Sequence, residues 1–553
     1  MKRISLGIAQ RVSEYNYLIK KMSIKKENFV MIPLNLETLL YYKKNNIKYI
    51  NLLEILNNKI HKDSIKIFQK IIPQIEKSFI YDDILKKRYI GILRKYFNSI
   101  FFFLKIINKI KKKSIIDKIY LSGWDSYSFK DIKKNFFVSR IVNELFQSKI
   151  DIVLVDKLKN EFSKNNLSII LPKKIKYNYI YLNNLGYNFK KIVIKNFFLN
   201  RLKILTPEDN NLSLLKKFLY RLLFVKFLKF KETKLIKSNI NMPIMKFKIS
   251  NKNIVKLLNF RSTHIIQELA SLINEKNQYL NLFKIKKPNK FFLNNSRGIN
   301  SYLIDYAKKE KILCFLISHG TLSHQKNYYS KMYNNTIAEE VSEKRAINCA
   351  QSGLALSYLK HHTNKKNLLK TGNLIFSNGD LKNKNYFVYA VTNRDFVNTH
   401  FYGIETFYEF FDNLKFLNNY SKKNNLKIIV KLHPGVIYLN SELSSNFKNL
   451  YFSNTRIEKL LKNSKAVISF SSTVIEDALN LRLPIILLDR WKRYNHFSKA
   501  NFLKSKRVKN YVNNTKDLDK IIKNFDLFKK NFSFEKTLFG ENPFYNFEKL
   551  LKM

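Results

Sequence analysis

Cysteine is almost absent from this sequence: Cys314 and Cys349 are the only two among 553 residues. Two cysteines are too few for a disulfide framework, and their separation does not match the spacing of metal ligands. We therefore expect no metal and no cofactor. The composition fits a reducing compartment, so the sequence predicts a cytoplasmic protein.

Long apolar segments are missing as well. Residues 1–21 contain no hydrophobic stretch of the signal-peptide kind, and no window reaches the roughly 18 uncharged apolar residues that span a bilayer. Secretion and membrane spanning are thus disfavoured. Two basic amphipathic stretches, residues 100–113 and 212–231, have the composition of helices that lie on an anionic membrane surface, here the inner face of the cell membrane. Packed helices with solvated lysines are the alternative.

Acidic residues are scarce relative to basic ones, with 41 Asp and Glu against 102 Lys and Arg, a formal net charge of +61. Such a charge raises the question of nucleic-acid binding, because cationic side chains displace the counterions of phosphates. The lysines, however, are spread over nearly every segment together with heavy use of Ile, Asn, Phe and Tyr, as in AT-rich coding sequences. The aromatic residues occupy apolar runs and do not alternate with basic residues as single-strand binding requires. We expect no nucleic-acid partner, and nucleic-acid binding stays as a remote alternative.

The hydrophobic pattern predicts an α/β protein of at least two domains, since 553 residues exceed one core. Residues 1–380 read as an N-terminal acceptor-side α/β domain with a helical insertion at about 205–285. A polar, turn-rich segment at 378–385 marks the boundary. Residues 381–553 alternate strand and helix as in a nucleotide-binding Rossmann-like domain. The predicted strands include 118–121, 150–155, 167–171 and 191–194 in the first domain and 386–391, 426–431, 466–470 and 485–488 in the second.

A serine-rich segment follows the predicted strand at 466–470 and precedes a helix. Ligands of doubly wound sheets bind at this edge, and Ser471, Ser472 and Thr473 together with the helix N-terminus suit a phosphate. Glu476, one turn into the helix, is placed to accept hydrogen bonds from ribose hydroxyls. The alternatives are an ordinary N-cap and an exposed helical glutamate.

A second polar segment, Lys431-Leu432-His433-Pro434-Gly435, follows the strand at 426–431. Strand alternation places Lys431 and His433 on one face, and Pro434 and Gly435 turn the chain. This segment is therefore expected to lie over the same sheet edge as the serine-rich one, and to bind the same ligand.

Glycine is also scarce, with 12 residues, so a glycine after a predicted strand marks a turn or a close backbone approach. His319, Gly320 and Thr321 follow a strand predicted at 311–317. His319 is the candidate general base, because an unperturbed pKa near 6.5 suits proton transfer. Gly372 and Asn373 lie in another polar turn and are further candidate site residues.

The runs KLHPG at 431–435 and SFSSTVIEDALNLRLPIILLD at 469–489 resemble bacterial surface-polysaccharide glycosyltransferases of the GT-B type, which build capsules and lipopolysaccharide. They are most similar to enzymes that use CMP-activated sugars, such as Kdo transferases and bacterial sialyltransferases. The resemblance implies two Rossmann-type domains facing a cleft. It also implies that His433 and Pro434 contact the cytidine phosphate, and that Ser471, Ser472 and Thr473 hold it.

The SHGT run at 318–321 also resembles CDP-glycerol glycerophosphotransferases, in which the histidine serves as the base. The resemblance is specific over about residues 311–490. The acidic D/E-D/E-G motif of the sialyltransferases has no match here, which leaves Glu339 and Glu340 as substitutes for the base unless they are a solvated helical pair.

Taken together, the resemblance implies an inverting, metal-independent transfer from a nucleotide-sugar donor to a glycan or lipid-linked glycan acceptor. A CMP-activated ulosonic acid is the favoured donor. A CDP-glycerol-type polyol phosphotransferase is the alternative.

Overall fold

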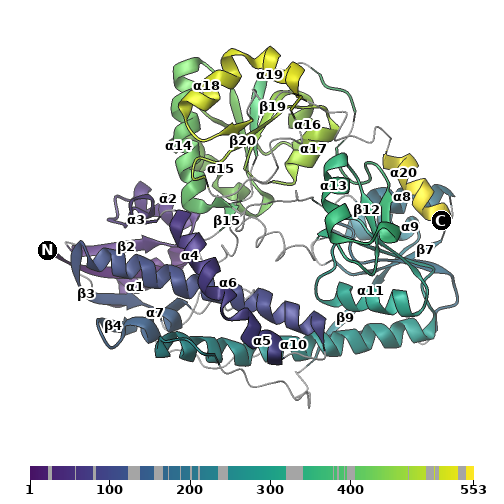
Figure 1. Ribbon diagram of the computed structural model, residues 1–553, viewed down its shortest axis with the longest axis horizontal. Helices are drawn as coiled ribbons and strands as arrows, with labels where there is room; N and C mark the ends of the chain where they lie inside the picture. Colours follow the sequence, from purple (N-terminus) through teal and green to yellow (C-terminus); the bar gives the residue numbers. More distant parts are fainter. Residues whose placement is uncertain are drawn as a thin grey trace.

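Three large parallel β-sheets and two two-stranded sheets, with helices packed around them, make up the described part of the chain in a computed structural model (Figure 1). The structure describes residues 1–22, 28–56, 58–78, 82–122, 138–154, 166–171, 174–186, 189–199, 202–209, 212–233, 247–318, 320, 341–377, 379–382, 385–390, 393–394, 405–470, 472–492, 503–504, 510–532 and 543–553. The expected α/β fold with two Rossmann-type sheets is confirmed, and a further four-stranded sheet precedes them.

The first sheet has the order β2-β1-β3-β4. Its strands are β1 (Lys2–Ala9), β2 (Phe29–Pro33), β3 (Ser114–Leu121) and β4 (Asp151–Leu154). The helices of this part are α1 (Val12–Met22), α2 (Leu36–Lys44), α3 (Leu52–Ile55), α4 (Asn58–Gln69), α5 (Ile72–Ser78), α6 (Asp83–Lys111) and α7 (Val138–Phe146). The strands expected to form one N-terminal domain are thus divided between this sheet and the next.

Helix α6 is long and largely buried. Its N-cap is Asp82, whose carboxylate accepts hydrogen bonds from the backbone N–H groups of Ile84 and Leu85 and so satisfies two of the free donors of the first turn. Its second half buries Phe101, Phe102 and their apolar neighbours in the core. The membrane-surface interpretation of residues 100–113 is therefore wrong, because the apolar side chains face protein. Among the described residues, no helix is long and apolar enough to cross a membrane.

The second sheet has seven parallel strands in the order β13-β12-β11-β10-β6-β7-β8. Numbered along the chain, six of them follow the Rossmann order 3-2-1-4-5-6, with one more strand at the edge. The strands are β6 (Tyr179–Leu182), β7 (Lys203–Pro207), β8 (Val225–Leu228), β10 (Lys290–Leu293), β11 (Leu313–Leu316), β12 (Ile347–Ala350) and β13 (Leu368–Lys370). The helices are α8 (Lys190–Leu199), α9 (Leu214–Leu222), α10 (Lys252–Ile285), α11 (Ile299–Lys309) and α13 (Gly353–His362).

Two sequence-based expectations about this part are wrong. Residues 191–194 lie in helix α8, since their apolar side chains are spaced for a helix that packs on one face only. The stretch 205–285 is not purely helical: it contains the end of β7, all of β8 and the short strand β9 (Phe230–Thr233), which pairs with β5 (Asn166–Ile169). Lysines alternate with apolar residues in β8 and β9, and in such short segments this pattern is also typical of a basic helix.

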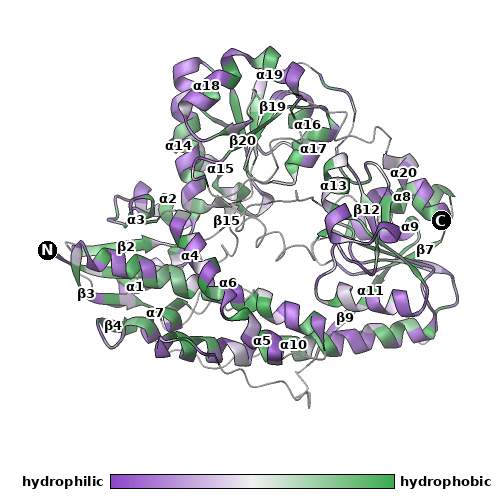
Figure 2. Ribbon diagram, viewed as in Figure 1, coloured by the Kyte–Doolittle hydropathy of each residue, from purple (hydrophilic) through white to green (hydrophobic). Residues whose placement is uncertain are grey.

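The third sheet has the complete Rossmann order, β18-β17-β14-β19-β20-β21, or 3-2-1-4-5-6 along the chain. Its strands are β14 (Tyr386–Ala390), β17 (Ile428–Lys431), β18 (Tyr451–Phe452), β19 (Ser464–Ser469), β20 (Ile485–Leu488) and β21 (Tyr511–Val512). The helices are α14 (Phe407–Asn424), α15 (Asn440–Asn446), α16 (Ile457–Lys462), α17 (Val474–Asn480), α18 (Thr515–Lys523) and α19 (Phe525–Asn531). Figure 2 shows hydrophobic strands here between helices that also carry hydrophilic residues, as a sheet covered on its faces requires.

The final helix, α20 (Pro543–Lys552), does not stay with the third sheet. It packs beside α8 of the second sheet (Figure 1), where Phe547 and Leu550 join the core around Ile192. An ion pair of 2.9 Å between the Lys195 ammonium group and the Glu548 carboxylate flanks this contact. The second sheet and its helices form the second unit, and the third sheet and its helices form the third unit. The third unit is therefore inserted between β13 and α20 of the second unit.

Candidate functional site

The second and third sheets meet through the polar segments that follow their strands. Because every strand in each sheet is parallel, the carboxyl ends of each sheet lie at one edge. Strands β11, β12 and β13 of the second sheet lead toward Gly320 and into residues 351–352 and 371–373, and β19 of the third sheet leads into α17. Contacts between these segments form the junction of the second and third sheets. This junction lies at the edge where doubly wound sheets bind ligands.

Gly320 approaches the third sheet closely. A methyl group built on its Cα would lie 3.0 Å from Cγ2 of Thr473, tighter than side chains normally pack. The backbone here is fixed from the second sheet, since the Ser318 hydroxyl donates to the Gly320 carbonyl at 2.6 Å and the Gln351 amide donates to the Ser318 carbonyl at 2.8 Å. Glycine is needed because the backbone lies close to Thr473, and not because φ is unusual. The neighbouring candidates His319 and Thr321, and Glu339 and Glu340, lie outside the described residues.

The turn after β13 has the conformation that its glycine predicts. Gly372 has φ of +71°, in the left-handed region, so a side chain would strain the backbone. Asn373 is buried, and its Oδ1 accepts from the Phe376 N–H at 2.9 Å. Gln351, which sequence reasoning missed, accepts from the N–H of Leu374 at 3.1 Å. Asn373 and Gln351 thus hold the shape of this turn.

Glu476 is buried at the junction, with only 2% of its surface exposed, so the interpretation as an exposed helical glutamate is wrong. Its Oε1 accepts a hydrogen bond of 3.2 Å from the hydroxyl of Ser352, the N-cap of α13. Burial raises the pKa of Glu476 to about 8, against the opposing effect of the Ser352 hydrogen bond. The raised pKa favours the neutral, protonated form of the group, and this form does not repel an anionic ligand. Its role toward a ribose stays a prediction.

Asp477, next in the helix, forms a second link that the sequence reasoning did not single out. Its Oδ1 accepts from both the backbone N–H and the hydroxyl of Ser377, each at 2.7 Å. Burial raises the pKa of Asp477 to about 6, while the Ser377 hydrogen bonds act to lower it. The consecutive acids in the apolar run VIEDAL were the available signal, because such pairs in a buried helix need partners.

The serine-rich segment lies at the switch point between β14 and β19. The Ser469 hydroxyl donates to the Ala390 carbonyl at 2.8 Å and so ties the ends of the two strands together. Ser472 is buried, and its hydroxyl accepts from the Val474 N–H at 3.3 Å, a local hydrogen bond of the turn that precedes α17, whose N-cap is Thr473. Thr473 is exposed and makes no side-chain cap bond. Ser471 lies outside the described residues.

The second polar segment follows β17, on the other side of β14. Two strand spacings, about 10 Å, separate β17 from β19, so Lys431 and the serine-rich segment leave the same edge of the sheet. Partial burial lowers the pKa of the Lys431 ammonium group. His433 is exposed, and its Nδ1 accepts from the Gly435 N–H at 3.2 Å. A cation and an accessible imidazole therefore border the switch point.

The chain turns after β17 because Pro434 begins a 3₁₀ helix, η6 (Pro434–Leu439). Gly435 does not have a positive φ, and a side chain there would make only ordinary contact with the His433 ring. The expectation that Gly435 forces the turn is thus wrong. The end of η6 contacts helix α2, where the Tyr438 hydroxyl donates to the Glu37 carboxylate at 3.3 Å. Within the part of the chain that the structure describes, no cluster of side chains has the composition of a metal site.

No protein-family model matches the chain, and no curated protein matches it in sequence. Solved structures with a similar arrangement include the UDP-GlcNAc 2-epimerase from Neisseria meningitidis bound to UDP-GlcNAc, which is 12% identical, with 68% of this chain and 98% of that chain covered and a TM-score of 0.40. The UDP-GlcNAc 2-epimerase from Methanocaldococcus jannaschii in complex with UDP-GlcNAc and UDP is 14% identical, with 68% and 98% covered and a TM-score of 0.38. The wall teichoic acid polymerase TagF is 14% identical, with 76% and 95% covered and a TM-score of 0.36. Because these scores are low, the function has to follow from this chain's own residues.

Proposed function

We propose that the chain is a glycosyltransferase that binds a nucleotide-activated sugar at the carboxyl edge of the third sheet and a glycan acceptor beside the second. One observation carries the proposal: polar segments at the carboxyl ends of two Rossmann-order sheets are in direct contact, through Gly320 and Thr473 and through Ser352 and Glu476. A ligand bound at the switch point of the third sheet would therefore face the second sheet.

The donor nucleotide would be held by the residues that border the switch point. Lys431 and His433 would stabilise the charge that develops on the departing phosphate, as preorganised electrostatics requires. Pro434, Gly435, Ser471, Ser472, Thr473 and Glu476 complete this donor set. The sequence resemblance favours CMP as the nucleotide and an ulosonic acid as the sugar.

The reaction would be a displacement at the anomeric carbon. The acceptor hydroxyl loses its proton to a base, its oxygen bonds to the anomeric carbon, and the bond from that carbon to the phosphate oxygen of the nucleotide breaks. His319 is the proposed base, with Gly320, Thr321, Gly372 and Asn373 on the acceptor side. Inversion at the anomeric carbon follows from a single displacement.

Thermal stabilisation by nucleotides tests this proposal. Titration with CMP, CDP, UDP and GDP should raise the melting temperature for the cytidine nucleotides, and His433→Ala and Ser472→Ala should remove the shift. His361→Ala on the far end of α13 and Ser444→Ala on exposed α15 are matched controls that should retain it. If no nucleotide stabilises the wild type, the transferase proposal fails and charge-driven nucleic-acid binding becomes the working hypothesis.

The alternative donor is a CDP-linked polyol, for which the same residues would serve. Incubation with CDP-glycerol would then release CMP and form a phosphodiester, visible as a new ³¹P resonance, whereas transfer from a CMP-sugar forms a glycosidic bond. Transfer to the acceptor, without hydrolysis of the donor, from only one of these two donor types decides between the phosphotransferase and the glycosyltransferase.

Peripheral contact with an anionic membrane is the last part of the proposal, and it rests on α9. None of its residues is buried, and one face carries Leu214, Leu215, Phe218, Leu219 and Leu222, each at least half exposed. Lys216 and Arg221 flank this face, which is the composition of a helix that inserts its apolar side among anionic headgroups. The neighbouring residues of the stretch 212–231 form β8 and β9, so only α9 has this role.

Vesicle flotation tests the membrane contact. The wild type should float with vesicles containing phosphatidylglycerol and less with phosphatidylcholine alone, and Leu215→Asp with Phe218→Asp should stay in the soluble fraction. Leu527→Asp, at a similarly exposed site on α19, is the control that should still float. Equal flotation of the two variants would remove α9 from the proposal.

A further inference from the structure

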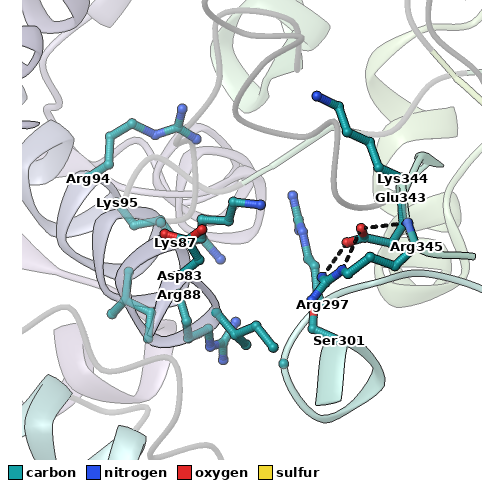
Figure 3. Close-up of a pocket in the computed structure, with 14 residues that line it drawn as sticks. Asp83, Lys87, Arg88, Arg94, Lys95, Arg297, Ser301, Glu343, Lys344 and Arg345 are labelled. Carbon is teal, nitrogen blue, oxygen red and sulfur yellow. Dashed lines mark hydrogen bonds and ion pairs between the residues drawn. The ribbon is translucent and has the colours of Figure 1, made fainter. Parts of the chain in front are cut away.

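A cavity of about 300 Å³, separate from the junction just described, lies between α6 and the second sheet (Figure 3). The first half of α6 lines one side with Lys87, Arg88, Arg94 and Lys95. These four side chains lie within little more than two turns of one helix. Like charges brought this close repel each other unless an anion or a carboxylate offsets them.

The opposite side is built from the start of α11 and from the segment before β12. It contributes Arg297, Lys344 and Arg345, whose side chains face those of α6 across the cavity in Figure 3. Ser301, in the first turn of α11, lines it as well. Seven of the fourteen lining residues are therefore lysine or arginine, and only Asp83 and Glu343 are acidic.

General lysine richness does not explain this cluster, because arginine is rare in the chain. The sequence contains 16 arginines among 553 residues, yet Arg88, Arg94, Arg297 and Arg345 all line this one cavity. A random set of fourteen residues would hold fewer than one. Guanidinium groups bind phosphate and carboxylate oxygens in pairs, which lysine does not do, so the choice of residue matches an oxyanion ligand.

The two acids of the cavity already have cationic partners. Asp83 forms an ion pair of 2.5 Å with Lys86, which lies outside the cavity lining, and the Lys86 hydrogen bond lowers the pKa of Asp83. Glu343 pairs with Arg345 at 2.6 Å. Burial acts to raise the pKa of Glu343, but the Arg345 hydrogen bonds outweigh it and the pKa is lowered. Both carboxylates therefore have a cationic partner, and the lining as a whole contains seven cationic and two acidic side chains.

Lys87 shows that the two sides form one electrostatic site. Its charge contributes to lowering the pKa of Asp83 on its own helix and of Glu343 on the opposite side. A ligand in the cavity would therefore feel the cations of both sides at once. Since these belong to α6 and to the second unit, an anion bound here would hold the two parts together.

One wall of the cavity follows the strand next to the one that leads to the acceptor side of the proposed reaction. Arg297 and Gly298 follow β10, and β10 pairs with β11, which leads to Ser318 and Gly320 at the junction. Gly298, the N-cap of α11, lines the cavity with φ of +58°, a conformation that side chains rarely adopt. Glycine is therefore the residue that this part of the wall requires.

We propose that this cavity binds a phosphate or diphosphate group of the acceptor. The assignment of the ligand as the acceptor rests on the proposed transfer reaction. The anion site itself does not depend on that reaction. Two sources have the same chemistry: a diphosphate that links a glycan to a lipid, and a phosphate on a water-soluble glycan.

Isothermal calorimetry on the full chain tests the site with defined anions. Inorganic pyrophosphate should bind the wild type, and Arg297→Gln and Lys87→Gln should each weaken binding by about tenfold, the loss of roughly 1.4 kcal/mol. Arg221→Gln, which removes the same charge from the exposed surface of α9, should bind like the wild type. Farnesyl diphosphate and glucose 6-phosphate, compared in the same variants, distinguish the lipid-linked from the soluble source.

The outcomes separate this inference from the proposed function. Arg297→Gln and Lys87→Gln should keep the thermal shift with cytidine nucleotides, because neither residue belongs to the donor set. Loss of pyrophosphate binding with nucleotide binding intact supports the cavity. Absence of pyrophosphate binding in the wild type, or equal binding by Arg297→Gln and Arg221→Gln, overturns the anion site even where nucleotides bind. If pyrophosphate binds but no nucleotide stabilises the wild type, only the proposed function is overturned.

Discussion

The Ser352 hydroxyl donates a hydrogen bond of 3.2 Å to the Glu476 carboxyl group across the junction of the second and third sheets. Ser352 caps α13 and Glu476 lies in the first turn of α17, so the bond connects two helices that begin at facing sheet edges. A protonated carboxyl group suits this place, because burial of the charged form is costly.

Glu476 should therefore make stability depend on pH. Folding raises its pKa from 4.5 to about 8, so its proton is held more tightly in the folded state. That contribution is complete below pH 4.5 and is lost as the pH rises to about 8, at up to about 1.4 kcal/mol per pH unit. Glu476→Gln keeps a neutral group and removes the dependence. The melting temperature of the wild type relative to the variant should fall between about pH 5 and pH 8, and parallel curves would contradict the burial of this acid.

Gly320→Ala should lower stability, because the new methyl group would lie 3.0 Å from Cγ2 of Thr473 and push the two sheets apart. Thr473→Ser removes that methyl carbon, so the double variant should recover most of the loss in a double-mutant cycle measured by urea unfolding. Gly91→Ala on α6 is a control of opposite sign: no atom lies within 4 Å of the new group, and alanine in a helix should add about 0.5–1 kcal/mol. Additive effects of the two junction changes would show that the contact is absent.

The ion pair within α10 should be costly to break. Arg261 and Glu268 lie 2.9 Å apart, with only 6% and 8% of their side chains exposed. Glu268→Gln leaves a buried guanidinium without its counterion, which should cost about 3–5 kcal/mol in chemical unfolding. Lys256→Gln, which removes a pair whose lysine is 67% exposed, should cost under about 1 kcal/mol. Similar losses for both would mean that solvent reaches Arg261.

Helix α20 should be essential for the second sheet. Phe547 is fully buried against α8, so Phe547→Ala should lower the free energy of unfolding by about 3–5 kcal/mol. Tyr545 lies on the exposed side of the same helix, with 56% of its surface accessible and the Lys549 ammonium group 5.0 Å from its ring centroid. Tyr545→Ala should therefore change the stability little. Equal losses for Phe547→Ala and Tyr545→Ala in the same unfolding experiment would contradict the packing of α20 on α8.

Much of the third unit could be predicted from the sequence. Its strands at 386–391, 426–431, 466–470 and 485–488 are found within two residues of their expected bounds, because continuous apolar runs between polar helices are typical of buried parallel strands. The common edge of Lys431 and Ser472 followed from the same alternation.

The second unit was harder to predict for physical reasons. Strand β8 carries Lys226 between apolar residues, so its pattern does not differ from that of a short basic helix. The burial of Glu476 and the part played by Gln351 depend on contacts between distant segments, which periodicity within one element cannot reveal. The cavity between α6 and the second sheet is likewise lined by residues more than 200 positions apart in the chain.

The return of α20 to α8 has a consequence for the order of events during synthesis. The core of the second unit needs Phe547 and Leu550, and these residues are made only after the whole third unit has been translated. The third unit can fold as its strands emerge, whereas the second must wait with an open apolar face on α8. A ribosome that pauses within residues 386–532 would therefore hold a nascent chain in which the apolar face of α8 is still uncovered, and a chaperone would be needed for that species.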